Sequence, residues 1–257
     1  MYRNIRIAIL LTILVIVAGS QWLTGSRFSS WEKPLWVTVF PVLLDTDTNI
    51  RKHAENLKAE SFQDIGIFLQ QQASRYGRKL DRPVIIQVAR PMTTVPPALP
   101  EENSGVRIGL WSLKMRWWSW KYGRQDDLAP DDIRIYVIFQ KRRDNVPMER
   151  SVGIKKGSYG IVNAVASRQM AARNRIVIVH ELLHILGATD KYDFDNQQPL
   201  DPDGLANPTQ SPLYPQSRAE IMAGRIASSV DSWRYPANLK ACAIGAKTAA
   251  EIGWSSE

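Results

Sequence analysis

The stretch VIVHELLHILGATDKYD, Val177–Asp193, decides how the fold is interpreted, because it contains two of the chain's three histidines. The β-branched run at its start would suit a strand. Its apolar residues nevertheless recur at helical spacing as far as Leu186, and Gly187 follows as a typical residue to end a helix. Buried helices tolerate β-branched residues because packing outweighs intrinsic propensity. The stretch therefore predicts a buried helix that ends at Leu186.

The two histidines and the glutamate of this stretch predict a metal site. Residues four apart lie on the same face of an α-helix, so His180 and His184 can bind one ion through their ring nitrogens. Glu181 lies about 100° around the helix from His180, where its carboxylate can take a proton from a metal-bound water. The alternative is a satisfied polar network inside a buried helix. Without partners, however, burial of these three groups would cost several kcal/mol, whereas a metal satisfies all of them.

The third protein ligand is expected to be a carboxylate. Only His53 remains, and it lies far upstream of the motif, so a site with three histidines is nearly excluded. Gly187 lets the chain turn sharply after the helix, and the returning chain can bring an oxygen of Asp190 to the ion. A zinc site made of two histidines and one carboxylate keeps a position open for water, as catalytic sites do.

The string HELLHILGATD, residues 180–190, resembles the metzincin pattern H-E-x-x-H-x-x-G-x-x-H. Asp190 stands in place of the last histidine, as it does in the aspartate-bearing metzincins. The resemblance implies a zinc metalloendopeptidase that hydrolyses peptide bonds in a protein or peptide substrate. In this family likeness Zn²⁺ is bound by His180, His184 and Asp190, and Glu181 is the general base.

The resemblance also carries expectations for the rest of the domain. It implies a methionine turn beneath the metal, for which Met222 in AEIMAGR is the candidate. It implies a substrate that lies extended and antiparallel to an edge strand, either 151–155 or 159–164. The preceding elements resemble the metzincin N-terminal subdomain, so the likeness extends over most of residues 34–252.

Three alternatives to this interpretation stay open. In a gluzincin-type peptidase a glutamate from a later helix is the third ligand, and Glu220 in SRAEIM is then the candidate. Asp193 is a further candidate for the same position. The chain could also be a non-catalytic, zinc-containing envelope module that binds peptide, although the intact Glu181 argues against this.

Residues 34–257 predict one domain of the α/β (α+β) class. We expect a mixed twisted sheet with a long backing helix and the histidine-bearing helix, followed by a smaller, loop-rich C-terminal subdomain that ends in a helix. The expected strands are 34–44, 83–89, 132–140, 151–156 and 159–166, the expected helices are 49–76 and 237–252, and a loop is expected at 193–215. The Trp-rich segment 109–123 is left unassigned: it could cover the core, form an aromatic belt at a membrane, or line a substrate groove.

The N-terminal residues 1–26 predict a signal anchor or a signal peptide, followed by a linker at 27–33. Two arginines precede a long uncharged run, which places the catalytic domain outside the cytoplasm, on the periplasmic face of a bacterial inner membrane, or secreted after cleavage. The net charge of +8 is spread along the chain and suits an anionic membrane surface better than nucleic acid, which we do not expect as a partner. The lone Cys242 permits an oxidising compartment.

Overall fold

The computed structural model describes residues 6–7, 11–12, 19, 25–44, 47–100, 105–141, 151–154 and 158–255. Most of the predicted anchor, residues 1–26, lies outside these ranges. Among the described residues, no helix is both long enough and apolar enough to span a bilayer.

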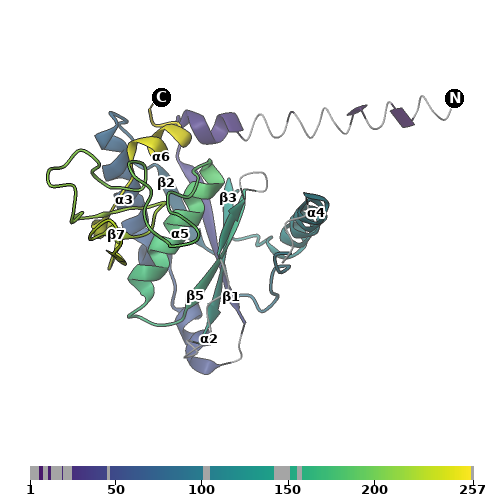
Figure 1. Cartoon of the computed structure of the whole chain (residues 1–257). Coiled ribbons are helices and arrows are strands. Elements are labelled where there is room, and N and C mark those ends of the chain that lie inside the picture. Colours follow the sequence, from purple (N-terminus) through teal and green to yellow (C-terminus); the bar gives the residue numbers. More distant parts are fainter. Residues whose placement is uncertain are drawn as a thin grey trace.

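The centre of the domain is a five-stranded sheet in the order β2-β1-β3-β5-β4 (Figure 1). The strands are β1 (Leu35–Leu43), β2 (Val84–Val88), β3 (Ile133–Gln140), β4 (Val152–Ile154) and β5 (Tyr159–Val165). Four are parallel, and β4 alone runs antiparallel, paired with β5 at the edge. The parallel strands are apolar along their length because both faces of the sheet are covered. The predicted mixed sheet of an α/β protein is confirmed.

Helices cover both faces of this sheet. On one face, α3 (Gln63–Arg75) and α5 (Ala171–Leu186) enclose the larger core, and on the other α4 (Gly105–Tyr122) packs over a smaller aromatic core. Figure 1 shows α4 on the side of the sheet away from α3 and α5. The Trp-rich segment that the sequence left unassigned is therefore helical and lies far from α5.

The single backing helix predicted at 49–76 is wrong. The chain forms α2 (Thr48–Glu55), a 3₁₀ turn (Ala59–Phe62) and then α3. Lys58 is extended, with φ −132° and ψ 170°, and its N–H donates to the Ser61 side chain, which starts the 3₁₀ turn. A change of direction at this point lets both helices bury apolar faces, which one straight helix could not do.

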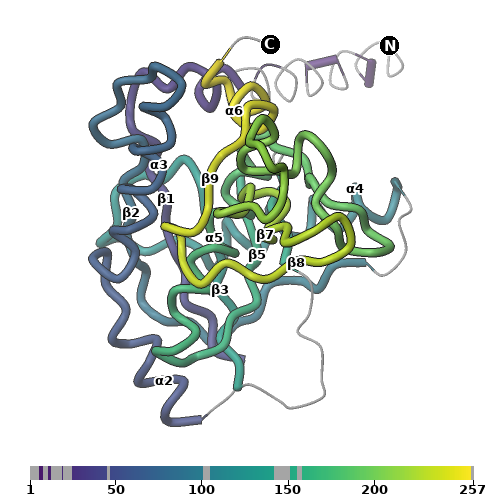
Figure 2. The backbone as a smooth tube through the Cα atoms, turned by 60° about the vertical axis from the view of Figure 1, so that its left-hand side comes forward, coloured from purple at the N-terminus to yellow at the C-terminus, as the bar shows by residue number. Residues whose placement is uncertain are grey.

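The predicted C-terminal helix at 237–252 is also largely wrong. Only α6 (Ala246–Glu251) is α-helical, because the preceding residues form a 3₁₀ turn and the short strand β9 (Cys242–Ala243), which pairs with β6 (Ala219–Glu220). A further pair, β7 (Ile226–Ala227) with β8 (Trp233–Arg234), completes this loop-rich part. Figure 2 shows β9 close to α3, and the backbone N–H of Ile244 donates to Gln72 of that helix at 3.0 Å.

Candidate metal centre

The helix α5 is buried and ends at the residue that the sequence predicts. It ends at Leu186, and Gly187 follows in the left-handed conformation with φ 116°. The Gly187 N–H donates to the carbonyl of Leu183, and so does the N–H of Ala188, so the last turn is closed and the chain reverses. This reversal returns residues 188–191 along the helix toward the two histidines.

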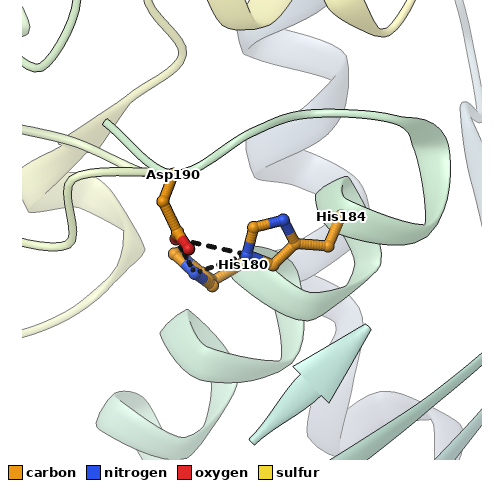
Figure 3. Close-up of side chains that lie close together, drawn as sticks. All are labelled: His180, His184 and Asp190. Carbon is orange, nitrogen blue, oxygen red and sulfur yellow. Dashed lines mark hydrogen bonds and ion pairs between the residues drawn. The ribbon is translucent and has the colours of Figure 1, made fainter. Parts of the chain in front are cut away.

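The reversal brings three potential ligand atoms together (Figure 3). Asp190 Oδ1 lies 3.1 Å from His180 Nε2 and 3.2 Å from His184 Nε2. The two Nε2 atoms lie 3.1 Å from each other. In the part of the chain that the structure describes, this is the one group of three or more histidine, cysteine or acidic side chains close enough to share an ion.

Backbone carbonyls fix the orientation of both imidazoles. His180 Nδ1 lies 3.0 Å from the Ile221 carbonyl oxygen, and His184 Nδ1 lies 2.8 Å from that of Ala188. A carbonyl can only accept, so each Nδ1 must carry the proton. In its neutral form each imidazole therefore directs an unprotonated Nε2 at Asp190, which is the tautomer that a metal requires.

These donors fit a bound zinc ion. Ligand atoms around a tetrahedral zinc with bonds of about 2.0–2.1 Å lie about 3.3 Å apart, close to the separations here. Without a cation, two nitrogen lone pairs and a carboxylate oxygen would face one another in a mostly buried site, and Asp190 Oδ1 has no hydrogen-bond partner within the described structure. Two imidazoles and one carboxylate are also a donor set of catalytic zinc sites.

Without a cation, a protonated imidazole and an ionised carboxylate in this site would stabilise each other. Burial alone would lower the pKa of His180, but its acidic neighbours Asp190 and Glu181 raise it. Burial opposes ionisation of Asp190, yet the two imidazoles hold the pKa of that carboxyl well below its usual range. The acidic oxygen is therefore ionised and available to a cation.

Glu181 lies beside the three ligand atoms but is not one of them. Its side chain is buried, and Oε2 has no hydrogen-bond partner among the described residues. Burial raises the pKa of Glu181, while the two histidines and the Gly153 N–H oppose the rise. A Cβ at Gly153 would overlap the Glu181 carbonyl oxygen and lie 2.9 Å from His184 Cβ, so β4 can approach α5 this closely only through glycine.

Contacts of Glu251 with the residues on both sides of Asp190 hold its backbone in place. Lys191 Nζ lies 2.9 Å from Glu251 Oε2, and their side chains are only 4% and 15% exposed. The Thr189 N–H and hydroxyl also donate to Glu251, at 3.0 Å and 2.8 Å. The residues before and after Asp190 are therefore fastened to one carboxylate on α6, a contact that the sequence analysis missed.

The two alternative ligands lie elsewhere. Glu220 is fully buried on β6, and its carboxylate accepts hydrogen bonds from four donors: the N–H groups of Met222, Ala223 and Gly245, and the Thr248 hydroxyl. Its role is to brace the turn that presents the Ile221 carbonyl to His180. The Asp193 carboxylate accepts from the N–H groups of Asp195 and Asn196 and so caps a loop turn. Neither residue joins the group of three.

The turn at Met222 lies against the site through its backbone. Met222 is buried, its carbonyl accepts from the Lys191 N–H at 3.2 Å, and Gly224 completes the turn with φ 66°. The carbonyl of its neighbour Ile221 is the one that orients His180. The segment thus contacts the site through backbone carbonyls, and the methionine turn beneath the metal stays a prediction.

A pocket of about 220 Å³ opens next to His180 and Glu181. Its walls are largely apolar, and two arginines stand in its lining, Arg173 and Arg225. The guanidinium of Arg225 lies over the Tyr192 ring at 4.4 Å, and its Nε is buried without a hydrogen-bond partner in the described chain. Sequence reasoning missed this pocket because its walls come from segments far apart in the chain.

Comparison with known proteins adds no family to this geometry. Neither a scan against protein-family models nor a search of the curated proteins finds a match for the chain. The resemblance to metzincins therefore stays a prediction that depends on residues 180–190. What supports it is the arrangement of His180, His184, Asp190 and the neighbouring Glu181.

Proposed function

We propose that the protein is a zinc-dependent endopeptidase of the metzincin type. The observation that supports this most directly is the convergence of His180 Nε2, His184 Nε2 and Asp190 Oδ1 beside the buried carboxylate of Glu181. A structural zinc site would need a fourth protein ligand and no neighbouring base. Among the described residues no fourth side chain joins the group, and His180 and Glu181 line an adjacent pocket.

Each residue then has a defined task. His180, His184 and Asp190 would hold the zinc, which when bound would supply a nucleophile at neutral pH and polarise the carbonyl of the peptide bond. Glu181 accepts a proton at its unpaired Oε2 and later delivers it to the leaving amine. The Ile221 and Ala188 carbonyls keep both imidazoles in the metal-binding tautomer.

An extended substrate would pair with the outer edge of β4. Of the two predicted candidates, 159–164 is wrong, because β5 lies inside the sheet between β3 and β4. Among the described strands, only β5 pairs with β4. A peptide added there would run next to Gly153, and thus next to Glu181 and His184.

The pocket suits a substrate side chain next to the scissile bond. Apolar walls accommodate methylene groups, and the guanidiniums of Arg173 and Arg225 lie over aromatic rings with no carboxylate partner among the described residues. A glutamate side chain complements both properties. We expect peptides with glutamate beside the scissile bond to be cleaved faster than matched peptides with glutamine.

We also propose the location given by the sequence, with the catalytic domain outside the cytoplasm and residues 1–26 directing it to the membrane. The location does not affect the chemistry of the site. It predicts that the folded domain is reached by protease added to spheroplasts but not by protease added to inverted membrane vesicles.

Metal content and cleavage tested together decide the proposal. The purified wild type should contain one zinc per chain and cleave an unfolded protein in a chelator-sensitive manner. Glu181→Gln should retain zinc and lose about 10²–10⁴-fold in rate, whereas the exposed Glu60→Gln should lose neither. Full activity of Glu181→Gln would refute the assigned role. Zinc at full occupancy with no cleavage of any substrate would favour the non-catalytic peptide-binding module.

A further inference from the structure

One side of α4 exposes an unusual amount of apolar surface. The side chains concerned are 54% to 74% exposed and are Val106, Leu110, Leu113, Trp117 and Trp120. Their spacing places them within about 80° of one another around the helix, in a single stripe along its length. We call these five residues the α4 stripe. A contiguous apolar surface of this kind on a globular domain marks an interaction site.

The α4 stripe is exposed because the opposite side of the helix is fixed to the sheet. Trp111, Met115 and Trp118 are buried against the strands, and the Trp111 Nε1–H donates to the Pro97 carbonyl at 3.0 Å. The hydroxyls of Ser119 and Tyr136 are hydrogen bonded at 2.7 Å. The helix cannot turn the stripe inward without breaking these contacts.

Cations flank the stripe. The segment 105–125 contains Arg107, Lys114, Arg116, Lys121 and Arg124 and no acidic residue. Lys114 and Lys121 lie about 60–80° from the middle of the stripe on the same flank, and Lys121 Nζ lies 5.0 Å from the centre of the Trp117 ring. Long basic side chains next to exposed tryptophans allow charge to reach lipid phosphates while the rings enter the interface.

We propose that the α4 stripe docks on an anionic lipid bilayer. The helix would lie in the plane of the interface, with the apolar side chains at the level of the acyl boundary and the lysines and arginines at the headgroups. A second copy of the chain fits less well, because a symmetric contact would bring the same basic flanks together. This proposal is independent of the metal centre, since α4 and α5 cover opposite faces of the sheet (Figure 1).

The test must separate docking of α4 from any membrane binding by residues 1–26, so it uses the full chain and a local probe. Leu113→Cys carries a fluorophore whose emission is quenched by lipids with a shallow spin label. Val230→Cys is the control, because Val230 lies on a loop of the C-terminal part and is 77% exposed, against 65% for Leu113. The buried Cys242 is left in place. Vesicles contain phosphatidylcholine alone or with about 30% phosphatidylglycerol.

We expect quenching at position 113 only with the anionic vesicles and no quenching at position 230. Lys114→Gln combined with Lys121→Gln should lower the docking equilibrium constant about 30-fold, since each lysine contributes about 1 kcal/mol near an anionic surface. The proposal is overturned by an unquenched probe at position 113 on vesicle-bound protein, or by equal quenching in both lipid mixtures. Self-quenching that grows with protein concentration without vesicles would identify a second copy as the occupant and also overturn it.

Discussion

The helices α5 and α4 depart from ordinary burial in opposite directions. α5 encloses the carboxylate of Glu181 and two imidazoles within a largely apolar core, whereas α4 presents five large apolar side chains to solvent. Buried polar groups and exposed apolar patches are the informative exceptions to the usual distribution. In α5 the proposed cation would offset the exception, and in α4 the proposed membrane surface would. In each helix, the proposed function therefore depends on residues that are unusually buried or exposed for their polarity.

Removal of the acidic ligand should have the largest effect on α5. Asp190→Ala should weaken zinc binding by more than the roughly 100-fold that a change outside the ligand shell causes. Asp193→Ala is the matched control, because that carboxylate only caps a loop turn. Competition with a chromophoric chelator measures both. Equal losses in the two variants would contradict the ligand assignment.

Truncation of one leucine in each helix sharpens the comparison directly. Leu182 on α5 is 1% exposed and Leu113 on α4 is 65% exposed. Leu182→Ala should cost about 3 kcal/mol in the free energy of unfolding, and Leu113→Ala should change it by less than about 0.5 kcal/mol. Urea denaturation of both variants provides the values. A large loss for Leu113→Ala would mean that the α4 stripe is covered in the isolated protein.

The ion pair beside the metal centre should contribute stability that depends on pH. Burial opposes ionisation of Glu251, but Lys191 and Thr189 outweigh it and lower its pKa. A carboxyl whose pKa is lower in the folded protein stabilises above the unfolded pKa of about 4.3, and this stabilisation is lost as pH falls through the folded value. Glu251→Gln should therefore cost about 2 kcal/mol at neutral pH, and its difference from the wild type should shrink in acid. A difference that stays constant down to low pH would contradict this.

Glycine substitutions should have effects of opposite sign in the two regions. Gly153→Ala places a methyl group against Glu181 and His184 and should cost about 1–3 kcal/mol while reducing activity. Gly109→Ala on α4 meets nothing within 4 Å and should stabilise by about 0.5–1 kcal/mol, because alanine favours the helix. Thermal unfolding of both variants tests the pair. Destabilisation by Gly109→Ala would show that α4 has a close neighbour there.

The sequence predicted the sheet better than the helices. Strands buried on both faces produce continuous apolar runs, so the segments around β1, β2, β3 and β5 were identified correctly. The helix predicted at 49–76 was wrong because the helical spacing of apolar residues continues in the sequence past Lys58. In the structure the backbone at Lys58 is not helical, and its N–H donates to the Ser61 side chain. The C-terminal helix failed because Cys242–Ala243 pairs with a strand more than 20 residues away, and such pairings override local propensity.

The candidate site shows the same limit. His180, Glu181 and His184 could be identified because their spacing within one helix fixes their geometry, and Gly187 indicated the turn that brings back Asp190. Gly153, Glu251 and the Ile221 carbonyl could not, because only the tertiary fold brings them to the site. The α4 stripe could in principle have been predicted, because its residues recur at helical intervals. The apolar residues on the buried side of the helix conceal this pattern in the sequence.

The close packing of Gly153 against α5 has a thermodynamic consequence. The strand β4 would pair with a substrate along its outer edge. The same strand also contacts the backbone of α5, the helix that contains His180 and His184. Occupancy of the edge and occupancy of the ion site are then linked equilibria. If a bound peptide raises the affinity for zinc by some factor, zinc must raise the affinity for that peptide by the same factor. A slowly cleaved peptide ligand should therefore slow the removal of zinc by chelators.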